Sequence, residues 1–272
     1  MSTLRKHCKA RTLQAKENSK RPVRKGVWKC KDCRKQFSVT VGTIFEKSHI
    51  PLNKWLLATF LMNSSKKGMS FHQMHRMLQV TYKTAWFMTH HIRYAMKTIF
   101  PTDDKFSGVV EVDETYVGGK GRGKRGRGSG TKAPVFSLVE RNGRVMSTPV
   151  DRVTSANLKS IIRQNVDKST TIMTDDFASY RGLGKEFAQH CIIKHSTGEY
   201  VRGDIHTNTI EGYFSLLKRG IIGVYHHVSK HHLHRYLSEF DFRYNRRTFD
   251  DTDRSIAALM NIEGKRLQYK DS

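Results

Sequence analysis

Three acidic residues, far apart along the chain, constrain most strongly what this protein can fold into. Asp113 lies in the middle of an alternating, β-branched stretch, Asp175 follows a short apolar run, and Glu211 lies in a helical pattern. A charged carboxylate inside a strand is costly to bury without compensation. Carboxylates that meet at one point bind Mg²⁺, because this cation prefers hard oxygen ligands. The sequence therefore predicts a fold that brings the three acids together at a divalent-metal site.

Two of these acids have neighbours that compete for the same role. Glu114 follows Asp113 and Asp176 follows Asp175. Because successive strand residues point to opposite faces, we expect Glu114 to be a surface or supporting acid. For the second acid, the alternative to Asp175 is its neighbour Asp176. Glu111 shares a face with Asp113 and is a weaker competitor.

The helix that carries Glu211 also carries basic residues. Lys218 lies seven positions beyond Glu211, and Arg219 follows it. Positions seven apart share a helical face, so the carboxylate and the ammonium group point the same way. We expect Lys218 and Arg219 to support the site by binding phosphate groups.

The net charge restricts the class of partner. The chain of 272 residues has 49 Lys and Arg against 24 Asp and Glu, a formal net charge of +25. Such an excess indicates a polyanionic partner. No apolar run approaches the ~20 residues of a spanning helix, and no secretory signal is evident. We therefore expect DNA as partner, no membrane, and a cytoplasmic, nucleoid-associated protein.

The first 47 residues form a basic segment with an incomplete metal motif. Cys30 and Cys33 form a C-x₂-C pair, which is half of a tetrahedral zinc site. Cys8 is a third candidate ligand, but Arg5 occupies the position where its C-x₂-C partner would stand. Two interpretations stay open: a degenerate zinc-ribbon-like site, or a basic arm that binds phosphate without metal.

Residues 48–100 have the pattern of a helix-turn-helix module. A short helix, a tight turn and a longer helix capped by Thr81 follow one another. We expect four polar residues of the longer helix to face outward, and the first and last of them to contact DNA: Lys83, His90, His91 and Arg93. An ordinary three-helix bundle would show the same pattern.

Residues 106–272 switch to a mixed pattern. The expected order is β-β-β-α-β-α-β-α, with a hairpin at Asn142-Gly143. This order predicts an α/β domain with the ribonuclease H-like fold, a mixed five-stranded sheet with helices. In this fold the first strand is central and the fourth lies beside it, which brings Asp113 close to Asp175. A C-terminal helix with a basic outer face ends near Arg246, a further DNA-binding candidate.

A glycine-rich basic stretch at 118–132 interrupts this domain. It contains Lys124, Arg125 and Arg127 and no acid. It lacks the spacing of a phosphate-binding P-loop. A solvated hairpin tip and a loop that contacts DNA are equally compatible with the sequence.

Several of these segments resemble a known family. Residues 112–119, 174–175, 206–220 and 240–246 resemble the bacterial insertion-sequence transposases that join an N-terminal zinc ribbon to a DDE catalytic domain. The resemblance implies DNA cleavage and strand transfer at terminal inverted repeats. It also implies two Mg²⁺ ions, replaceable by Mn²⁺, bound by Asp113, Asp175 and Glu211. A homodimer on DNA is expected, because two ends must be brought together.

One ligand and the activity itself have alternatives. Asn208 shares a helical face with Glu211, and either side chain could reach the metal. We favour Glu211, since a third negative charge binds Mg²⁺ better than an amide, and we assign Asn208 a supporting role. The alternatives to a transposase are a ribonuclease H-like nuclease without strand transfer and a non-catalytic DNA-binding regulator.

Overall fold

The computed structural model describes residues 10–12, 26–118 and 132–267. The chain divides into two compact units, which are not contiguous in sequence. The helical unit comprises the described parts of 1–64, 71–95 and 251–272, and the sheet unit comprises those of 65–70 and 96–250. Each unit is considered separately.

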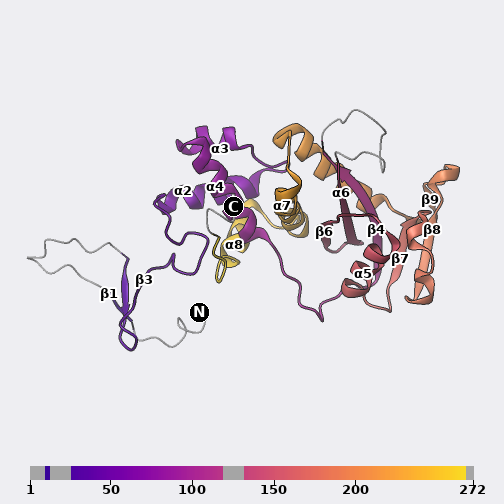
Figure 1. Cartoon of the computed structure of the whole chain (residues 1–272), viewed down its shortest axis with the longest axis horizontal. Helices are drawn as coiled ribbons and strands as arrows, with labels where there is room; N and C mark the ends of the chain where they lie inside the picture. Colours follow the sequence, from indigo (N-terminus) through magenta and orange to yellow (C-terminus); the bar gives the residue numbers. More distant parts are fainter. Residues whose placement is uncertain (1–9, 13–25, 119–131, 268–272) are drawn as a thin grey trace, which may run out of the picture. The chain divides into compact units, whose positions relative to one another are not determined.

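In its described residues the helical unit contains the helices α2 (Leu52–Ser64), α3 (Phe71–Leu78), α4 (Tyr82–Met96) and α8 (Asp251–Met260) (Figure 1). The fully buried Trp55 of α2 packs on Phe45, with ring centroids 5.2 Å apart. The guanidinium of Arg254 on α8 donates to the carbonyl of Asn63 on α2 at 2.7 Å. Helix α8 therefore packs in the helical unit, although its sequence position follows the sheet unit in which we had expected it.

Helix α4 lacks the polar outer face that the sequence predicted. Every residue from 88 to 93 is buried, so this part of the helix is enclosed on all sides. The predicted outward orientation of His90, His91 and Arg93 is therefore wrong. Each ring nitrogen of His91 lies 2.9 Å from a carbonyl oxygen, Nδ1 from that of Phe87 and Nε2 from that of Leu267. Lys83, the second residue of the helix, is exposed as predicted.

A small antiparallel sheet precedes the helices, with the order β1 (Ala10–Thr12), β2 (Trp28–Cys30) and β3 (Gln36–Phe37). The C-x₂-C pair lies where β2 turns into β3, and the backbone N–H of Cys30 donates to the carbonyl of Lys35 at 3.0 Å. Cys30 is buried and Cys33 is exposed. Cys8 and Arg5 lie outside the described residues, so the zinc hypothesis stays a prediction.

The sheet unit contains a five-stranded mixed sheet. Its strands are β4 (Val109–Val117), β5 (Ala133–Glu140), β6 (Val145–Pro149), β7 (Thr171–Asp175) and β8 (Gln189–Ile193), in the order β6-β5-β4-β7-β8. The first three strands are antiparallel neighbours, whereas β4, β7 and β8 are parallel. This topology fits the predicted ribonuclease H-like fold, with the first strand in the centre.

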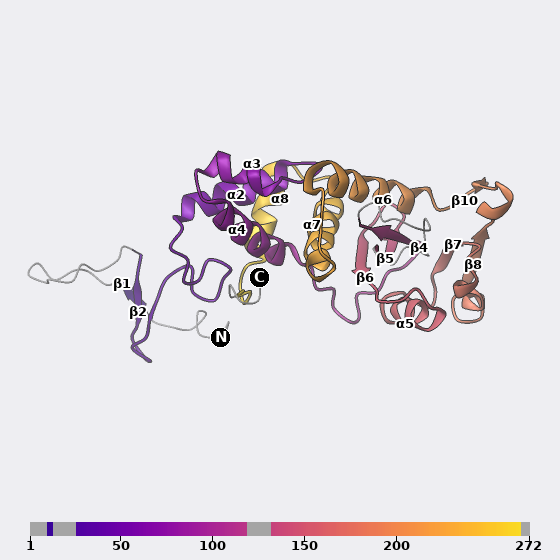
Figure 2. The ribbon, with the colours of Figure 1, turned by 45° about the horizontal axis from the view of Figure 1, so that its top comes forward.

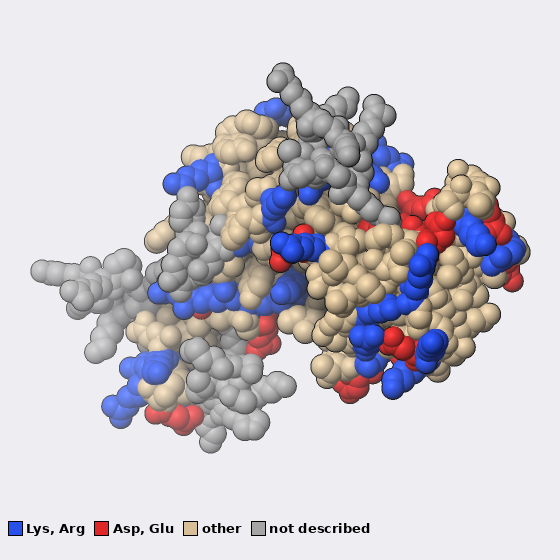
Figure 3. Space-filling model, turned by 45° about the vertical axis from the view of Figure 1, so that its right-hand side comes forward, with Lys and Arg blue, Asp and Glu red and all other residues tan. Residues whose placement is uncertain are grey.

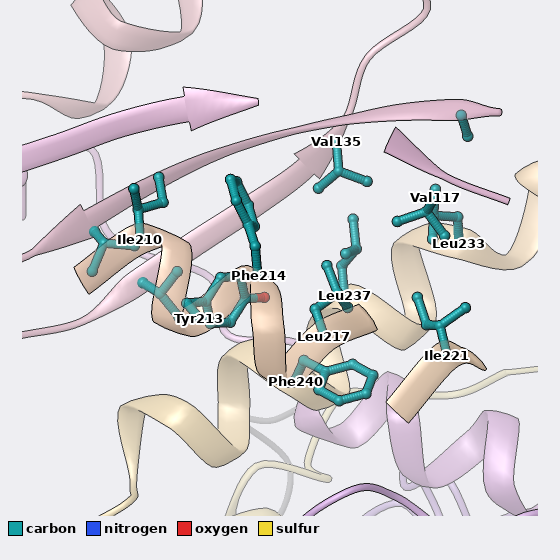
Figure 4. Packing of buried hydrophobic residues seen from close by; sticks show 13 residues of the cluster. Val117, Val135, Ile210, Tyr213, Phe214, Leu217, Ile221, Leu233, Leu237 and Phe240 are labelled. Carbon is teal, nitrogen blue, oxygen red and sulfur yellow. The ribbon is translucent and has the colours of Figure 1, made fainter. Parts of the chain in front are cut away.

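Helices cover both faces of this sheet. Helix α5 (Ser155–Asn165) lies on one face, and α6 (Asn208–Gly220) and α7 (Leu233–Asn245) lie on the other (Figure 2). Val110 and Val112 of β4 join the cluster on the α5 side. On the opposite side Phe214 and Leu217 of α6 pack with Val117 (Figure 4). Even-numbered β4 residues therefore face α5, and odd-numbered ones face α6.

Helix α7 closes the outer edge of the sheet. Asn245 accepts from the N–H of Val145 at 2.7 Å and donates to its carbonyl at 3.0 Å, and Asp241 accepts from the N–H of Ser147 at 2.8 Å. These side chains satisfy backbone groups of the edge strand β6 that would otherwise be open to pairing. Arg235 and Arg243 of this helix are buried, so its basic residues do not form a purely outer face as the sequence suggested.

A short connection follows β7. Two 3₁₀ turns, Ala178–Tyr180 and Leu183–Lys185, lie between β7 and β8, where the predicted order of elements had a helix. Among the described helices, none combines the length and the apolar character that crossing a bilayer requires.

Candidate active site

Two of the predicted acids follow the end of one strand pairing. The parallel ladder between β4 and β7 ends with the pair Glu111 and Met173. Asp113 and Asp175 each lie two residues beyond this last pair. Both carboxylates are partly buried. As an odd-numbered residue of β4, Asp113 lies on the face that α6 covers.

Electrostatics indicate that the third acid lies near them. Burial raises the pKa of Asp113 well above its usual value, and repulsion from Glu114, Asp175 and Glu211 adds to this increase. The N–H of Glu114 donates to Oδ1 of Asp113 at 2.7 Å and opposes the shift. In Figure 3 some Asp and Glu side chains lie together at the upper right of the surface, and others are scattered among Lys and Arg elsewhere. The fold therefore gives the three predicted acids a shared electrostatic environment.

Asp175 and its neighbour Asp176 have different surroundings. Oδ1 of Asp175 accepts from the N–H of Phe177 at 3.0 Å, which orients the carboxylate at the end of β7. Asp176 is exposed and accepts a hydrogen bond from the hydroxyl of Ser196, which lowers its pKa. Asp175, and not Asp176, is among the charges that raise the pKa of Asp113.

Glu211 lies in the first turn of α6 and is exposed. Its Oε1 accepts from the hydroxyl of Thr207 at 3.0 Å and lies 3.8 Å from Nε2 of His195. Asn208 is exposed one turn earlier, and its N–H donates to Nδ1 of His206 at 3.3 Å. The sequence had not indicated His195, because its position after β8 carries no recognisable motif.

The acids do not form a closed cage of ligands. Within the chain segments that the structure describes, no group of three or more His, Cys, Asp or Glu side chains has the arrangement to hold a metal ion. Glu211 is turned toward Thr207 and His195. The site thus presents hard oxygen atoms near one another but not converged on one point.

The two competing glutamates of β4 have structural partners. Glu114 is buried on the α5 side and accepts from the hydroxyl of Tyr180 at 2.6 Å, so the surface position considered for it is wrong. Glu111 is fully buried and accepts from Arg141 at 2.8 Å and from the N–H of Ile210 at 2.9 Å. The carboxylates of Glu114 and Glu111 therefore accept hydrogen bonds from other residues of the fold.

The predicted basic residues are partly accessible. Lys218 and Arg219 are exposed on α6, and Nε of Arg219 donates to the carbonyl of Ser215 at 3.1 Å. Arg246 is half-buried, with its guanidinium 4.0 Å from the ring centroid of Phe242. The remaining basic candidates lie outside the described residues: Lys124, Arg125 and Arg127.

Comparison with known proteins identifies the class to which this fold and site belong. Residues 105–245 match the ISXO2-like transposase domain. A protein of Halobacterium salinarum, described as an uncharacterized protein in transposable element ISH50, is 34% identical over 232 residues, which cover 79% of this chain and 76% of the relative. An uncharacterized transposase-like protein of Haemophilus influenzae is 31% identical over 102 residues, covering 38% of this chain and 81% of the relative.

Similarity to solved structures is weaker. A pre-cleavage Mos1 transpososome aligns with 11% identity and a TM-score of 0.29, over 82% of this chain and 83% of that one. A Drosophila P element transposase strand transfer complex aligns with 10% identity and a TM-score of 0.29, over 79% and 64%. The family assignment depends on the sequence matches: the chain belongs to the ISXO2-like transposases, a family of insertion-sequence proteins, as the resemblance implied.

Proposed function

We propose that this protein is a metal-dependent DNA transposase that cleaves DNA at the terminal inverted repeats of its element and joins the ends to target DNA. One observation carries the proposal. The buried carboxyl of Asp113 lies in the field of Asp175 and Glu211, within a domain of a transposase family. Perturbed carboxylates brought together from distant segments are typical of a catalytic centre.

The residues present fit a divalent cation. The donors are carboxylate oxygens, which Mg²⁺ and Mn²⁺ prefer. Burial raises the pKa of Asp113, repulsion from nearby carboxylates adds to this increase, and a cation would relieve that repulsion. Asp113, Asp175 and Glu211 would hold two Mg²⁺ ions. Bound metal supplies activation of a water or 3′-hydroxyl nucleophile and charge stabilisation at the leaving oxygen.

Glu211 is the preferred third ligand. Its side chain is exposed and is held by the hydroxyl of Thr207 and the nearby His195, so a rotamer change can turn it toward Asp113. Asn208 is equally exposed, but its neutral amide offsets less of the positive charge of Mg²⁺. Asn208 therefore supports the site and orients the substrate or Glu211.

Basic side chains would hold the DNA. The net charge of +25 favours a polyanion, and the exposed Lys218 and Arg219 follow Glu211 on α6, where they can bind the phosphates next to the cleaved bond. Lys83, Arg246 and the basic stretch around Lys124 would also contact DNA. A homodimer would pair the two ends, and Cys8, Cys30 and Cys33 would bind zinc if the N-terminal segment takes part in end recognition.

An in vitro strand-transfer assay tests this proposal. Pre-cleaved duplexes that carry the ends of the element are incubated with the full chain, plasmid DNA and Mg²⁺. We expect joined products with the wild type and none with Asp175→Asn, while DNA binding is retained. Asp176→Asn, which changes the adjacent exposed acid, is the matched control and should remain active.

The same assay separates the alternatives. Glu211→Gln and Asn208→Ala, run side by side, identify the third ligand as the position whose change is more damaging. Cutting of the plasmid without joining of the ends would indicate a nuclease. Equal products from the wild type and Asp175→Asn would reject the metal role of Asp175.

A further inference from the structure

A buried ion pair next to the acids connects the three elements that carry them. The pair is Glu111 of β4 and Arg141, the residue that follows β5. Resting on the proposed function, we propose that Glu111 and Arg141 are positioning residues, which set the distance and orientation of the metal-binding acids without touching the metal.

Glu111 connects the central strand to the start of α6. Its Oε1 accepts from Nε of Arg141 at 2.8 Å and from the hydroxyl of Thr209 at 2.9 Å. Its Oε2 accepts from the N–H of Ile210 at 2.9 Å. The first N–H groups of a helix have no partner within the helix and favour negative charge. Glu111 therefore anchors the first turn of α6 to β4.

Arg141 extends this connection to β7 and to the segment before α6. Its Nη1 donates to the carbonyl of Asp204 at 2.6 Å, and its Nη2 donates to the carbonyl of His206 at 2.9 Å. The same Nη2 lies 3.0 Å from the sulfur of Met173 on β7. A planar guanidinium can satisfy all these directions at once, which a lysine ammonium on a flexible stem cannot do.

Each anchor point lies next to one of the acids. Glu111 is two residues before Asp113 on the same strand face, and the residue it binds, Ile210, directly precedes Glu211. Met173, which Arg141 contacts, is two residues before Asp175. Displacement of the pair would therefore change the spacing of all three acids together.

Because the pair is largely buried, neither partner can be lost without affecting the other. The side chain of Glu111 is 0% exposed and that of Arg141 is 19% exposed. Removing one partner of a buried ion pair leaves a charge without compensation, which forces the surroundings to rearrange. The surroundings here are the start of α6 and the ends of β4 and β7.

The hairpin that carries Arg141 also provides a matched control. Arg144 lies at the other end of the same turn, is likewise 19% exposed, and forms an ion pair with Asp104 at 2.6 Å. It also donates to the carbonyl of Lys105 and stacks on Phe106, and none of these groups belongs to the elements that carry the acids. Arg141→Lys and Arg144→Lys therefore remove equivalent guanidinium networks, one beside the site and one away from it.

The experiment measures Mn²⁺ binding by the full-length protein, using the loss of the free-ion signal in electron paramagnetic resonance, together with thermal unfolding. We expect Arg141→Lys to raise the Mn²⁺ dissociation constant by about tenfold or more, as is typical when an outer partner of a metal ligand is changed. Arg144→Lys should leave it unchanged within about twofold, although both variants shift the unfolding temperature.

A second variant covers the case in which Arg141→Lys fails to fold. Thr209→Val removes one hydroxyl donor to Glu111 and keeps the shape of the side chain. It should weaken Mn²⁺ binding in the same direction but by less. If the wild type binds Mn²⁺ and the two arginine variants bind it equally, or Thr209→Val leaves it unchanged, the positioning role is overturned. A wild type that binds no Mn²⁺ overturns the proposed function, and this inference with it.

Discussion

Two partly buried aspartates, Asp113 and Asp241, have different surroundings. Burial raises the pKa of Asp113, and the charges of nearby carboxylates add to this increase. Asp241 on α7 instead accepts hydrogen bonds from the hydroxyl of Tyr213 at 2.5 Å and from the N–H of Ser147 at 2.8 Å. Burial nevertheless raises the pKa of Asp241 to about 7, because these hydrogen bonds offset only part of the desolvation. The carboxylates around Asp113 suit a cation, whereas the hydrogen bonds of Asp241 connect α7 to the edge strand β6.

Asp241 should make the stability of the sheet unit depend on pH. Its pKa rises from an ordinary value of 3.8 to about 7 on folding. Between these pH values the folded state holds a proton that the unfolded state has lost. The contribution of Asp241 to the free energy of unfolding therefore decreases as pH rises toward 7. We expect the free energy of unfolding of Asp241→Asn, measured by urea at pH 5 and pH 7.5, to fall less over this interval than that of the wild type.

The control for this measurement is Asp103→Asn, a change at an exposed aspartate of the same unit. It should retain the pH dependence of the wild type. If Asp241→Asn and Asp103→Asn show the same slope between pH 5 and pH 7.5, Asp241 does not carry the effect.

At the scale of elements, helix α6 has one face that packs in the core and another that carries the proposed functional residues. Ile210, Tyr213, Phe214 and Leu217 are buried against the sheet, whereas Glu211, Lys218 and Arg219 are exposed. Residues three and four apart share a helical face, so burying the apolar side fixes where the carboxylate and the basic side chains lie. The position of Glu211 therefore depends on the packing of its apolar neighbours.

Truncation of the buried face should destabilise the sheet unit. Phe214 is 5% exposed and lies within the cluster on the α6 side of the sheet (Figure 4). Phe214→Ala removes a large side chain from this core and should cost about 3–5 kcal/mol of unfolding free energy. Chemical denaturation of the full chain, followed by circular dichroism, measures the loss.

Leu216→Ala on the same helix is the matched comparison, because Leu216 is 39% exposed. Its cost should be below about 1 kcal/mol, since surface substitutions rarely exceed this range. Similar losses for the two variants would contradict the assignment of the buried face.

At the scale of the whole molecule, local sequence patterns predicted the order of helices and strands better than they predicted which elements pack together. Alternating apolar residues in β4 and the three-four spacing in α6 are local signals, and both elements form where the sequence predicted them. The position of Asp113 next to Asp175 followed from this order, because a central first strand with the fourth strand beside it is a property of topology.

Contacts between distant residues were beyond these local signals. Arg141 bonds to Glu111, which is 30 residues away in sequence, and to His206, which is 65 away. Its position beside the Asn142-Gly143 turn gives no information about these partners. Burial of His90 and Arg93 likewise depends on neighbours that surround α4 on every side, which helical periodicity alone cannot reveal.

The return of the chain to its first unit was also not predictable from periodicity. Helix α8 follows the sheet unit in sequence but packs against α2, where Arg254 bonds to the carbonyl of Asn63. An amphipathic helix fits any apolar surface of the right shape, so its pattern does not specify which surface it covers. The two units therefore share the chain in an interleaved order.

The central claim is that acids from β4, β7 and α6 form one divalent-metal site. Direct titration of the full-length protein with Mn²⁺, comparing the wild type with Asp175→Asn and Asp176→Asn, tests it without requiring a DNA substrate. The two aspartates are adjacent, but only Asp175 lies in the electrostatic environment of Asp113. We predict that the wild type and Asp176→Asn bind Mn²⁺ alike and that Asp175→Asn binds at least about tenfold more weakly. Equal binding by all three proteins, or none by the wild type, would contradict the account.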